Sequence, residues 1–275
     1  MLKKHSSEFS VFGNPINHTK SPYIHWLFSK QTGVFHSYDY TLVPLDKFRK
    51  FIVHFFLFQG IGANVTVPFK EEAFLISDEL TDHAKSSKSV NTLKKLSNGR
   101  ILGDNTDGKG ILYDLQRLKF IKKTDNVLVI GAGGAARGVI FSLLSYGCNV
   151  FVVNRTINRA IKLVNDFKKF GSIFIVSRKN IKYSSFHLII NATSNTQMNS
   201  YWNSIIHLID RKAYFYDINY SDNTHTHFLS WCINFGALMF SDGLGMLVSQ
   251  AAYSFYLWHG IFPEIDSVIF QLRKR

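Results

Sequence analysis

The chain has 275 residues, 46% of them hydrophobic and 19% charged, so it can bury one large core or two modest ones, and its composition excludes a disordered protein. A formal net charge of +13 would suit nucleic acid or an anionic membrane, but the lysines are scattered, so we expect neither partner. Cys148 and Cys232 lie in no redox or metal-binding spacing, and His225 and His227 lack a third ligand nearby, so we expect no metal. The densest apolar run, Phe51–Phe58, is too short to span a bilayer and predicts a buried helix face. We expect a reduced, cytoplasmic protein without a signal peptide.

The first hundred residues alternate between strand and helix patterns. Strands are predicted at Phe9–Gly13, His36–Val43 and Gly62–Val67, followed by a hairpin of Ser89–Leu96 and Arg100–Gly103 around an Asn-Gly turn. Helices are predicted at Pro22–Gln31, Leu45–Gln59 and Pro68–Leu80. This order predicts a layered α/β domain with a mixed sheet.

Several polar residues fall where these elements begin or end. Ser21 before Pro22 predicts a helix N-cap, although hydroxyls of Thr19 and Ser21 at a helix N-terminus would also suit a substrate carboxylate. Lys70 falls in a first helical turn, where the helix dipole opposes a cation, so an exposed lysine and a functional one remain equally open. Asp107 is a natural N-cap, yet a carboxylate near a lysine could form an acid–base pair.

Two polar residues near the C-terminus add to these candidates. Gln250 lies among apolar residues in the middle of a predicted helix and needs a hydrogen-bond partner if it is buried. Tyr220 follows a strand end, where it could be a rim aromatic residue or a hydroxyl that binds a ligand.

The second half of the chain begins with a predicted linking helix, Gly108–Leu118, and then a dinucleotide-binding pattern. A strand at Asn126–Ile130 leads into the glycine loop 131–138, a helix over Val139–Tyr146 and a second strand at Asn149–Val153. A glycine loop between a strand and a helix lets backbone N–H groups approach a pyrophosphate, and the helix N-terminus adds partial positive charge. This context predicts a nucleotide cofactor.

The end of the second strand distinguishes between the two nicotinamide cofactors. NAD-binding units usually place Asp or Glu there, whereas this chain has Asn154, Arg155 and Thr156, with Arg159 one turn on. No carboxylate would repel a 2′-phosphate, and a guanidinium could pair with it. We therefore predict NADP(H), although a solvated Arg-Thr turn would give the same residues.

The remaining elements complete a second domain. Further strands are predicted near Ser172–Val176, Leu188–Ala192, Tyr214–Ile218 and Ala237–Phe240, which indicates a Rossmann-like, doubly wound parallel sheet. Periodicity alone leaves open which domain the C-terminal helices, Leu244–His259 and Ser267–Leu272, complete.

Taken together, these segments resemble the shikimate dehydrogenases. The matching motifs stand in one order along the chain: GNPINHTKSP (13–22), GANVTVPFK (62–70), VNTL (90–93), GDNTDG (103–108), GAGGA (131–135), NRT (154–156), IINATS (189–194) and DGLGML (242–247). The resemblance implies reversible, NADPH-dependent reduction of 3-dehydroshikimate to shikimate, in the pathway to chorismate and the aromatic amino acids.

The resemblance also implies roles for individual residues. Lys70 and Asp107 correspond to the catalytic pair, with Lys70 transferring the proton at the carbinol oxygen. The substrate-binding residues implied are Thr19, Ser21, Thr66, Lys70, Asn91, Asp107, Tyr220 and Gln250. The cofactor-binding residues implied are Asp82, Gly131, Ala132, Gly133, Gly134, Ala135, Asn154, Arg155, Thr156, Arg159, Ile218 and Gly243.

The family fold has two α/β domains with the active site in the cleft between them. It implies a substrate domain of residues 1–106 completed by the C-terminal helices of 243–275, and an NADP-binding domain of residues 107–242. Three departures stand out: Thr19 where the family often has Ser, the stretch Asn195–Asn199 where it has a glycine-bearing loop, and Ile218 where Met is common.

Alternatives remain open beside this reading. A related quinate/shikimate dehydrogenase often uses NAD, which Asn154 and Arg155 disfavour. A non-catalytic relative that binds NADP or shikimate is disfavoured by the presence of both Lys70 and Asp107. Family members occur as monomers and as homodimers, so both states stay open.

Overall fold

The computed structural model describes residues 7–176, 186–193, 199–222 and 224–274. By its internal contacts the chain divides into two compact units. Unit 1 comprises the chain up to Asp107 together with the segment from Val248 onward, and unit 2 is Gly108–Leu247. The sequence interpretation placed the changes between domains at 106/107 and 242/243.

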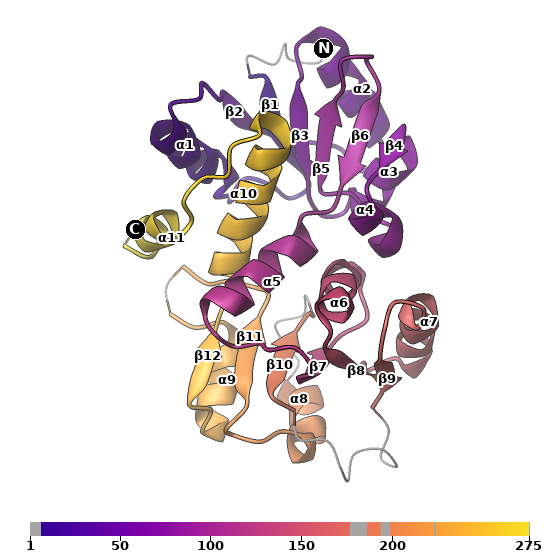
Figure 1. Cartoon of the computed structure of the whole chain (residues 1–275), viewed down its shortest axis with the longest axis vertical. Coiled ribbons are helices and arrows are strands. Elements are labelled where there is room, and N and C mark those ends of the chain that lie inside the picture. The colour runs from indigo at the N-terminus through magenta and orange to yellow at the C-terminus, as the bar shows by residue number, and fades with distance from the viewer. Residues whose placement is uncertain (1–6, 177–185, 194–198, 223, 275) are drawn as a thin grey trace. The chain divides into compact units, whose positions relative to one another are not determined.

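Unit 1 is built on a mixed six-stranded sheet with the order β2-β1-β3-β5-β6-β4 (Figure 1). Its strands are β1 (Phe9–Gly13), β2 (Tyr38–Leu42), β3 (Gly62–Val65), β4 (Glu79–Leu80), β5 (Thr92–Lys95) and β6 (Ile101–Asp104). β1 pairs in parallel with β2 and β3, whereas β5 runs antiparallel to both β3 and β6. The predicted mixed sheet and the β5–β6 hairpin are therefore confirmed.

Helices pack on this sheet. Those of unit 1 are α1 (Ser21–Thr32), α2 (Phe48–Phe58), α3 (Lys70–Ile76), α4 (Asp82–Ser87), most of α10 (Leu244–His259) and α11 (Asp266–Arg273). One hydrophobic cluster joins α2, α3 and α4 to β1, β3 and β5. Phe9 and Trp258 lie 4.9 Å apart between ring centroids, and Trp258 donates to the carbonyl of Leu93, which seats α10 on the sheet (Figure 1).

Unit 2 contains a fully parallel six-stranded sheet with the order β12-β11-β10-β7-β8-β9. Its strands are β7 (Asn126–Ile130), β8 (Asn149–Val153), β9 (Ile173–Ile175), β10 (Leu188–Asn191), β11 (Tyr214–Asp217) and β12 (Met239–Ser241). Read from β9, this is the strand order 3-2-1-4-5-6 of dinucleotide-binding sheets. The predicted doubly wound parallel sheet is confirmed.

The helices of unit 2 cover this sheet and enclose two hydrophobic clusters. They are α5 (Asp107–Arg117, of which Asp107 belongs to unit 1), α6 (Gly134–Tyr146), α7 (Ile157–Phe167), α8 (Asn199–Ile205), the 3₁₀ turn η2 (Ile206–Leu208) and α9 (His227–Phe235). None of the helices in the described ranges is long and apolar enough to cross a membrane.

Three sequence expectations were wrong in detail. The helix predicted over Pro68–Leu80 ends at Ile76. The chain then leaves the helix and forms β4, a strand of only two residues that pairs with β6, before α4 begins. Such a short strand carries no periodic pattern of its own. Ser21 is not an N-cap: α1 begins at Ser21, and its N-cap is Lys20, without a side-chain hydrogen bond.

The run Phe51–Phe58 is only partly the buried face that the sequence predicted. Ile52, Phe55 and Phe56 are buried, whereas Leu57 and Phe58 are exposed by 74% and 66%. The helix turns successive residues through both faces, so a continuous apolar run cannot be buried along its whole length.

Candidate active site

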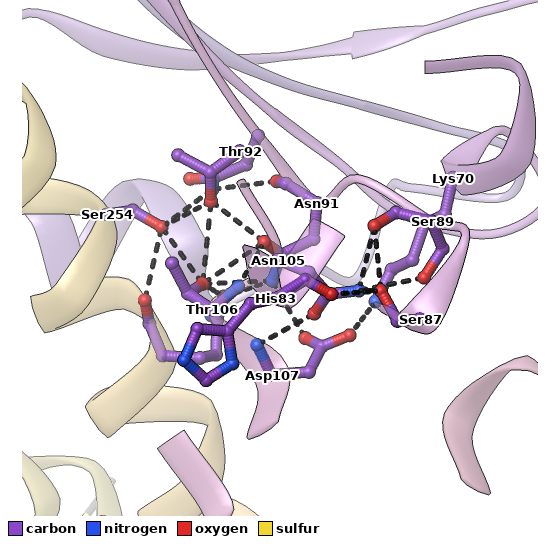
Figure 2. A network of polar contacts seen from close by, with 12 residues as sticks. Lys70, His83, Ser87, Ser89, Asn91, Thr92, Asn105, Thr106, Asp107 and Ser254 are labelled. Atoms are coloured by element: carbon purple, nitrogen blue, oxygen red, sulfur yellow. Dashed lines mark hydrogen bonds and ion pairs between the residues drawn. The ribbon is translucent and has the colours of Figure 1, made fainter. Parts of the chain in front are cut away.

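Lys70 and Asp107 form a close ion pair within unit 1. Lys70 is the first residue of α3 and Asp107 the first of α5, and Lys70 Nζ donates to Asp107 Oδ2 at 2.6 Å. The side chains are 29% and 13% exposed, so the pair is shielded but reachable from solvent. Figure 2 shows it at one end of a network of polar side chains. Asp107, which the sequence also allowed as an N-cap, instead gives its carboxylate to this network.

Asn91, which directly precedes β5, holds the other oxygen of Asp107. Its Oδ1 accepts the backbone N–H of Thr106 at 2.8 Å, and because that group can only donate, the orientation of the amide is fixed. Asn91 Nδ2 must then face Asp107 Oδ1, to which it donates at 2.8 Å. Asn91 is only 3% exposed, so its amide is a rigid support for the carboxylate.

Gln250 of α10 joins the same network. Its Oε1 accepts from Asn91 Nδ2 at 3.2 Å and from Thr106 Oγ1 at 3.4 Å. Gln250 is half-buried, and these contacts link it to Lys70 through Asn91 and Asp107. Behind it lie three fully buried hydroxyls, those of Thr92, Thr106 and Ser254 (Figure 2).

Asn105 orients the backbone from which Asp107 projects. Asn105 Oδ1 accepts the N–H of Asp107 at 3.1 Å, and its Nδ2 donates to the hydroxyls of Ser87 and Ser89. The amide is 2% exposed and is shown among its partners in Figure 2. Sequence reasoning did not assign Asn105, although its place between Asp104 and Asp107 in a run of four polar residues was a usable signal.

The predicted carboxylate-binding hydroxyls lie together at the start of α1. Thr19 Oγ1 donates to Ser21 Oγ at 3.1 Å and accepts the N–H of Ser21 at 3.2 Å. The hydroxyl of Tyr38 neighbours Ser21 and donates to Asn64 Oδ1 at 2.7 Å, and burial raises the pKa of Tyr38 well above its ordinary value. Sequence reasoning missed Tyr38 and Asn64, because both occur inside strands that read as structural.

Thr66, another predicted substrate contact, directly follows β3. Its backbone N–H donates to the carbonyl of Phe12 at 2.9 Å, and its methyl group packs against Gly13 so closely that a Cβ there would lie 2.4 Å away. The side chain is half-buried. The β1 and β3 ends therefore hold Thr66 firmly in place.

The glycine loop of unit 2 has the geometry that a nucleotide requires. Gly131 has a φ of 118°, and a Cβ at this residue would lie 2.9 Å from the carbonyl oxygen of Ala192, so only glycine fits. α6 begins at Gly134 with Gly133 as its N-cap, and a Cβ at either would meet nothing within 4 Å. Ala132 and Ala135 complete the loop, leaving an open backbone at a helix N-terminus.

The predicted phosphate clamp lies between β8 and α7. Asn154 Nδ2 donates to the carbonyl of Thr156 at 2.8 Å, and the N–H of Arg159 donates to the same carbonyl at 3.1 Å. Both Arg155 and Arg159 are exposed, and no carboxylate of the described residues forms an ion pair with either. Arg155 neighbours Tyr201, whose pKa burial raises to about 12 against the opposing effect of the guanidinium.

Ile218 and Gly243 lie against each other in unit 2. A Cβ at Gly243 would lie 2.2 Å from the carbonyl oxygen of Ile218, and the N–H of Gly243 donates to Asn219 at 2.9 Å. Tyr220, half-buried beyond β11, also belongs to unit 2, and burial raises the pKa of its hydroxyl, with Asp222 nearby adding to the rise.

The two remaining sequence expectations fall elsewhere. Asp82 lies at the start of α4 with an 89% exposed side chain, 3.8 Å from Lys85. It takes no part in the network around Lys70. Residues 195–198 of the altered loop Asn195–Asn199 are outside the described residues.

Comparison with known proteins identifies the family. Three family descriptions match consecutive parts of the chain: the shikimate dehydrogenase substrate binding domain over residues 11–93, shikimate/quinate 5-dehydrogenase over 115–223, and the shikimate 5′-dehydrogenase C-terminal domain over 243–269. A shikimate dehydrogenase (NADP(+)) of Buchnera aphidicola subsp. Baizongia pistaciae is 59% identical, with 100% of this chain and 99% of that protein covered.

Solved structures give the same result. Shikimate 5-dehydrogenase from Thermus thermophilus, in complex with NADP(H) and shikimate, is 30% identical with a TM-score of 0.84, covering 97% of this chain and 98% of that one. Shikimate dehydrogenase from Aquifex aeolicus is 31% identical with a TM-score of 0.84, covering 100% of both chains. The fold, the order of its parts and the full-length identity together show that this chain belongs to the shikimate dehydrogenase family.

Proposed function

We propose that this protein catalyses the reversible, NADPH-dependent reduction of 3-dehydroshikimate to shikimate, as the names of its relatives indicate for them. The observation that carries the proposal is the 2.6 Å ion pair of Lys70 and Asp107, held by Asn91 at the second carboxylate oxygen. Unit 1 is then the substrate and catalytic domain, and unit 2 is the NADP-binding domain. The shikimate pathway of the cytoplasm is the proposed setting, and free Cys148 and Cys232 suit a reducing compartment.

Lys70 carries the proton in this proposal. When bound, NADPH supplies the hydride that reduces the carbonyl carbon of 3-dehydroshikimate, and the carbonyl oxygen then needs one proton. The ammonium of Lys70 is the donor, and Asp107, fixed by Asn91, holds that ammonium in position. In the direction of shikimate oxidation, neutral Lys70 accepts the same proton from the hydroxyl.

The substrate is a carboxylic acid with several hydroxyls, and unit 1 offers groups for each. Thr19 and Ser21, at the N-terminus of α1, bind the carboxylate, which that end of a helix favours. Asn91, Gln250 and Thr66 bind ring hydroxyls, and Tyr220 contributes from unit 2. Thr19 retains the hydroxyl of the serine that is common in the family, so carboxylate binding is preserved.

The residues of unit 2 fit a dinucleotide that carries a 2′-phosphate. The open backbone at Gly133 and Gly134 can approach a pyrophosphate, with Gly131, Ala132 and Ala135 shaping the loop. Exposed Arg155 and Arg159, without carboxylate partners in the described ranges, bind the 2′-phosphate, with Asn154 and Thr156 shaping the turn. Ile218 and Gly243 line the nicotinamide end, and Asp82 is the remaining proposed contact.

The decisive experiment follows NADPH oxidation at the nicotinamide absorbance after 3-dehydroshikimate is added, with NADH and quinate run in parallel. We expect rapid oxidation of NADPH and little of NADH. Preference for quinate and NAD would instead identify the related quinate/shikimate activity. Binding of NADPH by a folded protein that transfers no hydride would identify a non-catalytic relative.

A further inference from the structure

A cluster of buried hydroxyls lies around Asn91. Thr92 Oγ1 lies 2.8 Å from Ser254 Oγ, and Thr106 Oγ1 lies 3.4 Å and 3.3 Å from these two oxygens (Figure 2). All three residues have no exposed surface. They cannot touch a substrate, so any influence on the reaction must pass through their neighbours.

Of these hydroxyls, that of Thr92 has the clearest direction. It lies 2.9 Å from Asn91 Oδ1, which accepts the backbone N–H of Thr106 and therefore can only be an acceptor. In this contact Thr92 Oγ1 is the donor. The hydroxyl also accepts from Asn64 Nδ2 at 3.1 Å.

The hydroxyl of Thr106 cannot replace this contact. It lies 3.1 Å from Asn91 Oδ1 and 3.0 Å from Asn91 Nδ2, so it faces both ends of the amide and favours neither orientation. Thr92 contacts only the oxygen end. Of the two threonine hydroxyls that contact the Asn91 amide, that of Thr92 therefore favours one orientation of the amide, whereas that of Thr106 does not.

We propose that Thr92 is a positioning residue, whose hydroxyl holds the Asn91 amide so that its nitrogen faces Asp107 and Gln250. Asp107 in turn holds Lys70, so Thr92, together with the backbone N–H of Thr106, supports the geometry of the proton donor without touching it. The expected change in kcat rests on the proposed function, whereas the expected change in the Asn91 amide does not.

The test compares two variants at one site. Thr92→Val keeps the size and the β-branched shape of the side chain and removes the hydroxyl, whereas Thr92→Ser keeps the hydroxyl. We expect kcat to fall roughly fivefold to tenfold in Thr92→Val, the effect of about one lost hydrogen bond, with the KM for NADPH unchanged. Thr92→Ser should restore most of kcat.

Ser249 offers a matched control on α10. It is as fully buried as Thr92, but its Oγ has no hydrogen-bond partner among the described residues. Ser249→Ala therefore removes a buried hydroxyl without disturbing the network, and kcat should stay at the wild-type value. An equal loss in Ser249→Ala, or an equal loss in Thr92→Ser, would show a packing effect and overturn the proposal.

A second measurement does not depend on activity. The side-chain amide signals of Asn91 in a ¹H–¹⁵N spectrum, assigned with Asn91→Asp, should move and exchange faster in Thr92→Val but not in Ser249→Ala. Unchanged amide signals in Thr92→Val would refute the role of Thr92, whether or not the protein is active. A wild-type protein that reduced no substrate would refute only the proposed function. If Thr92→Val does not fold, Thr92→Cys, with its weaker S–H donor, takes its place in both measurements.

Discussion

Two buried histidines of unit 1, His25 and His36, form a chain with half-buried His259, and the neutrality of the buried rings should make the fold sensitive to acid. His36 Nε2 lies 3.0 Å from His25 Nδ1, and His259 Nε2 lies 2.9 Å from His36 Nδ1. Each contact needs one nitrogen to accept, so doubly protonated rings would break the chain. Burial, with His259 nearby as a smaller cause, lowers the pKa of His36 to about 3, and burial also lowers the pKa of His25 well below its ordinary value.

The pKa of His36 sets the size and the sign of the effect. An unfolded histidine has a pKa near 6.5, so between about pH 6.5 and pH 3 the unfolded chain binds a proton that folded His36 does not. Stability is therefore fully present above this window and is lost as the pH falls through it. His36 is 6% exposed, so solvent screens it little. The free energy of unfolding should therefore fall by about 2 kcal/mol between pH 7 and pH 5 for this ring alone.

The assay is chemical denaturation of the wild-type protein and of His36→Gln at several pH values between 7 and 5. The free energy of unfolding should depend less on pH in His36→Gln, by roughly 1.4 kcal/mol per pH unit in the lower half of that range. His18, an exposed histidine of the same unit, gives the matched comparison variant His18→Gln. The same slope in His36→Gln and the wild type would show that His36 is not held neutral.

Four further substitutions test the proposed site. Lys70→Ala should lower kcat by roughly 10²-fold or more with a modest change in substrate binding, as steady-state kinetics would show, and an unchanged rate would remove this residue from proton transfer. Arg155→Ser should cost about 1.5–3 kcal/mol in kcat/KM with NADPH but little with NADH, and equal effects would contradict a 2′-phosphate contact. Gly243→Ala should lower the melting temperature, because its Cβ would lie 2.2 Å from the carbonyl oxygen of Ile218. Gly134→Ala, where a Cβ meets nothing within 4 Å, should keep that temperature while weakening NADPH binding, as titration calorimetry would measure.

The sequence predicted best those elements whose local pattern and tertiary role agree. β1, β7 and β8 have the predicted bounds, because each is an apolar run that ends at glycine or at a polar residue. The two residues of β4 escaped prediction, since their strand character exists only through pairing with β6. Local residues cannot reveal a pairing that joins Glu79 to Leu102 and Leu80 to Gly103, far along the chain.

The charged residues of the proposed site could be picked out from the sequence, but the side chains that support them could not. Lys70 and Asp107 could be singled out, because a charged residue at the start of a helix is visible in the sequence. Thr92, Asn64 and Ser254 could not be singled out, because a serine, threonine or asparagine looks the same in the sequence whether it is solvated or buried. What distinguishes them is a shared hydrogen-bond network that brings together β3, β5 and α10.

The positions of the two charges support the proposed role of Lys70, which the sequence alone left even. Both residues begin a helix, and the positive end of a helix dipole favours the carboxylate of Asp107 and opposes the ammonium of Lys70. A lysine selected for stability alone would lie at the other end of α3. The carboxylate at 2.6 Å offsets the unfavourable dipole, and Asn91 keeps that carboxylate from turning away. A lysine in an unfavourable place, with a carboxylate that holds it there, is what the proposed proton transfer requires.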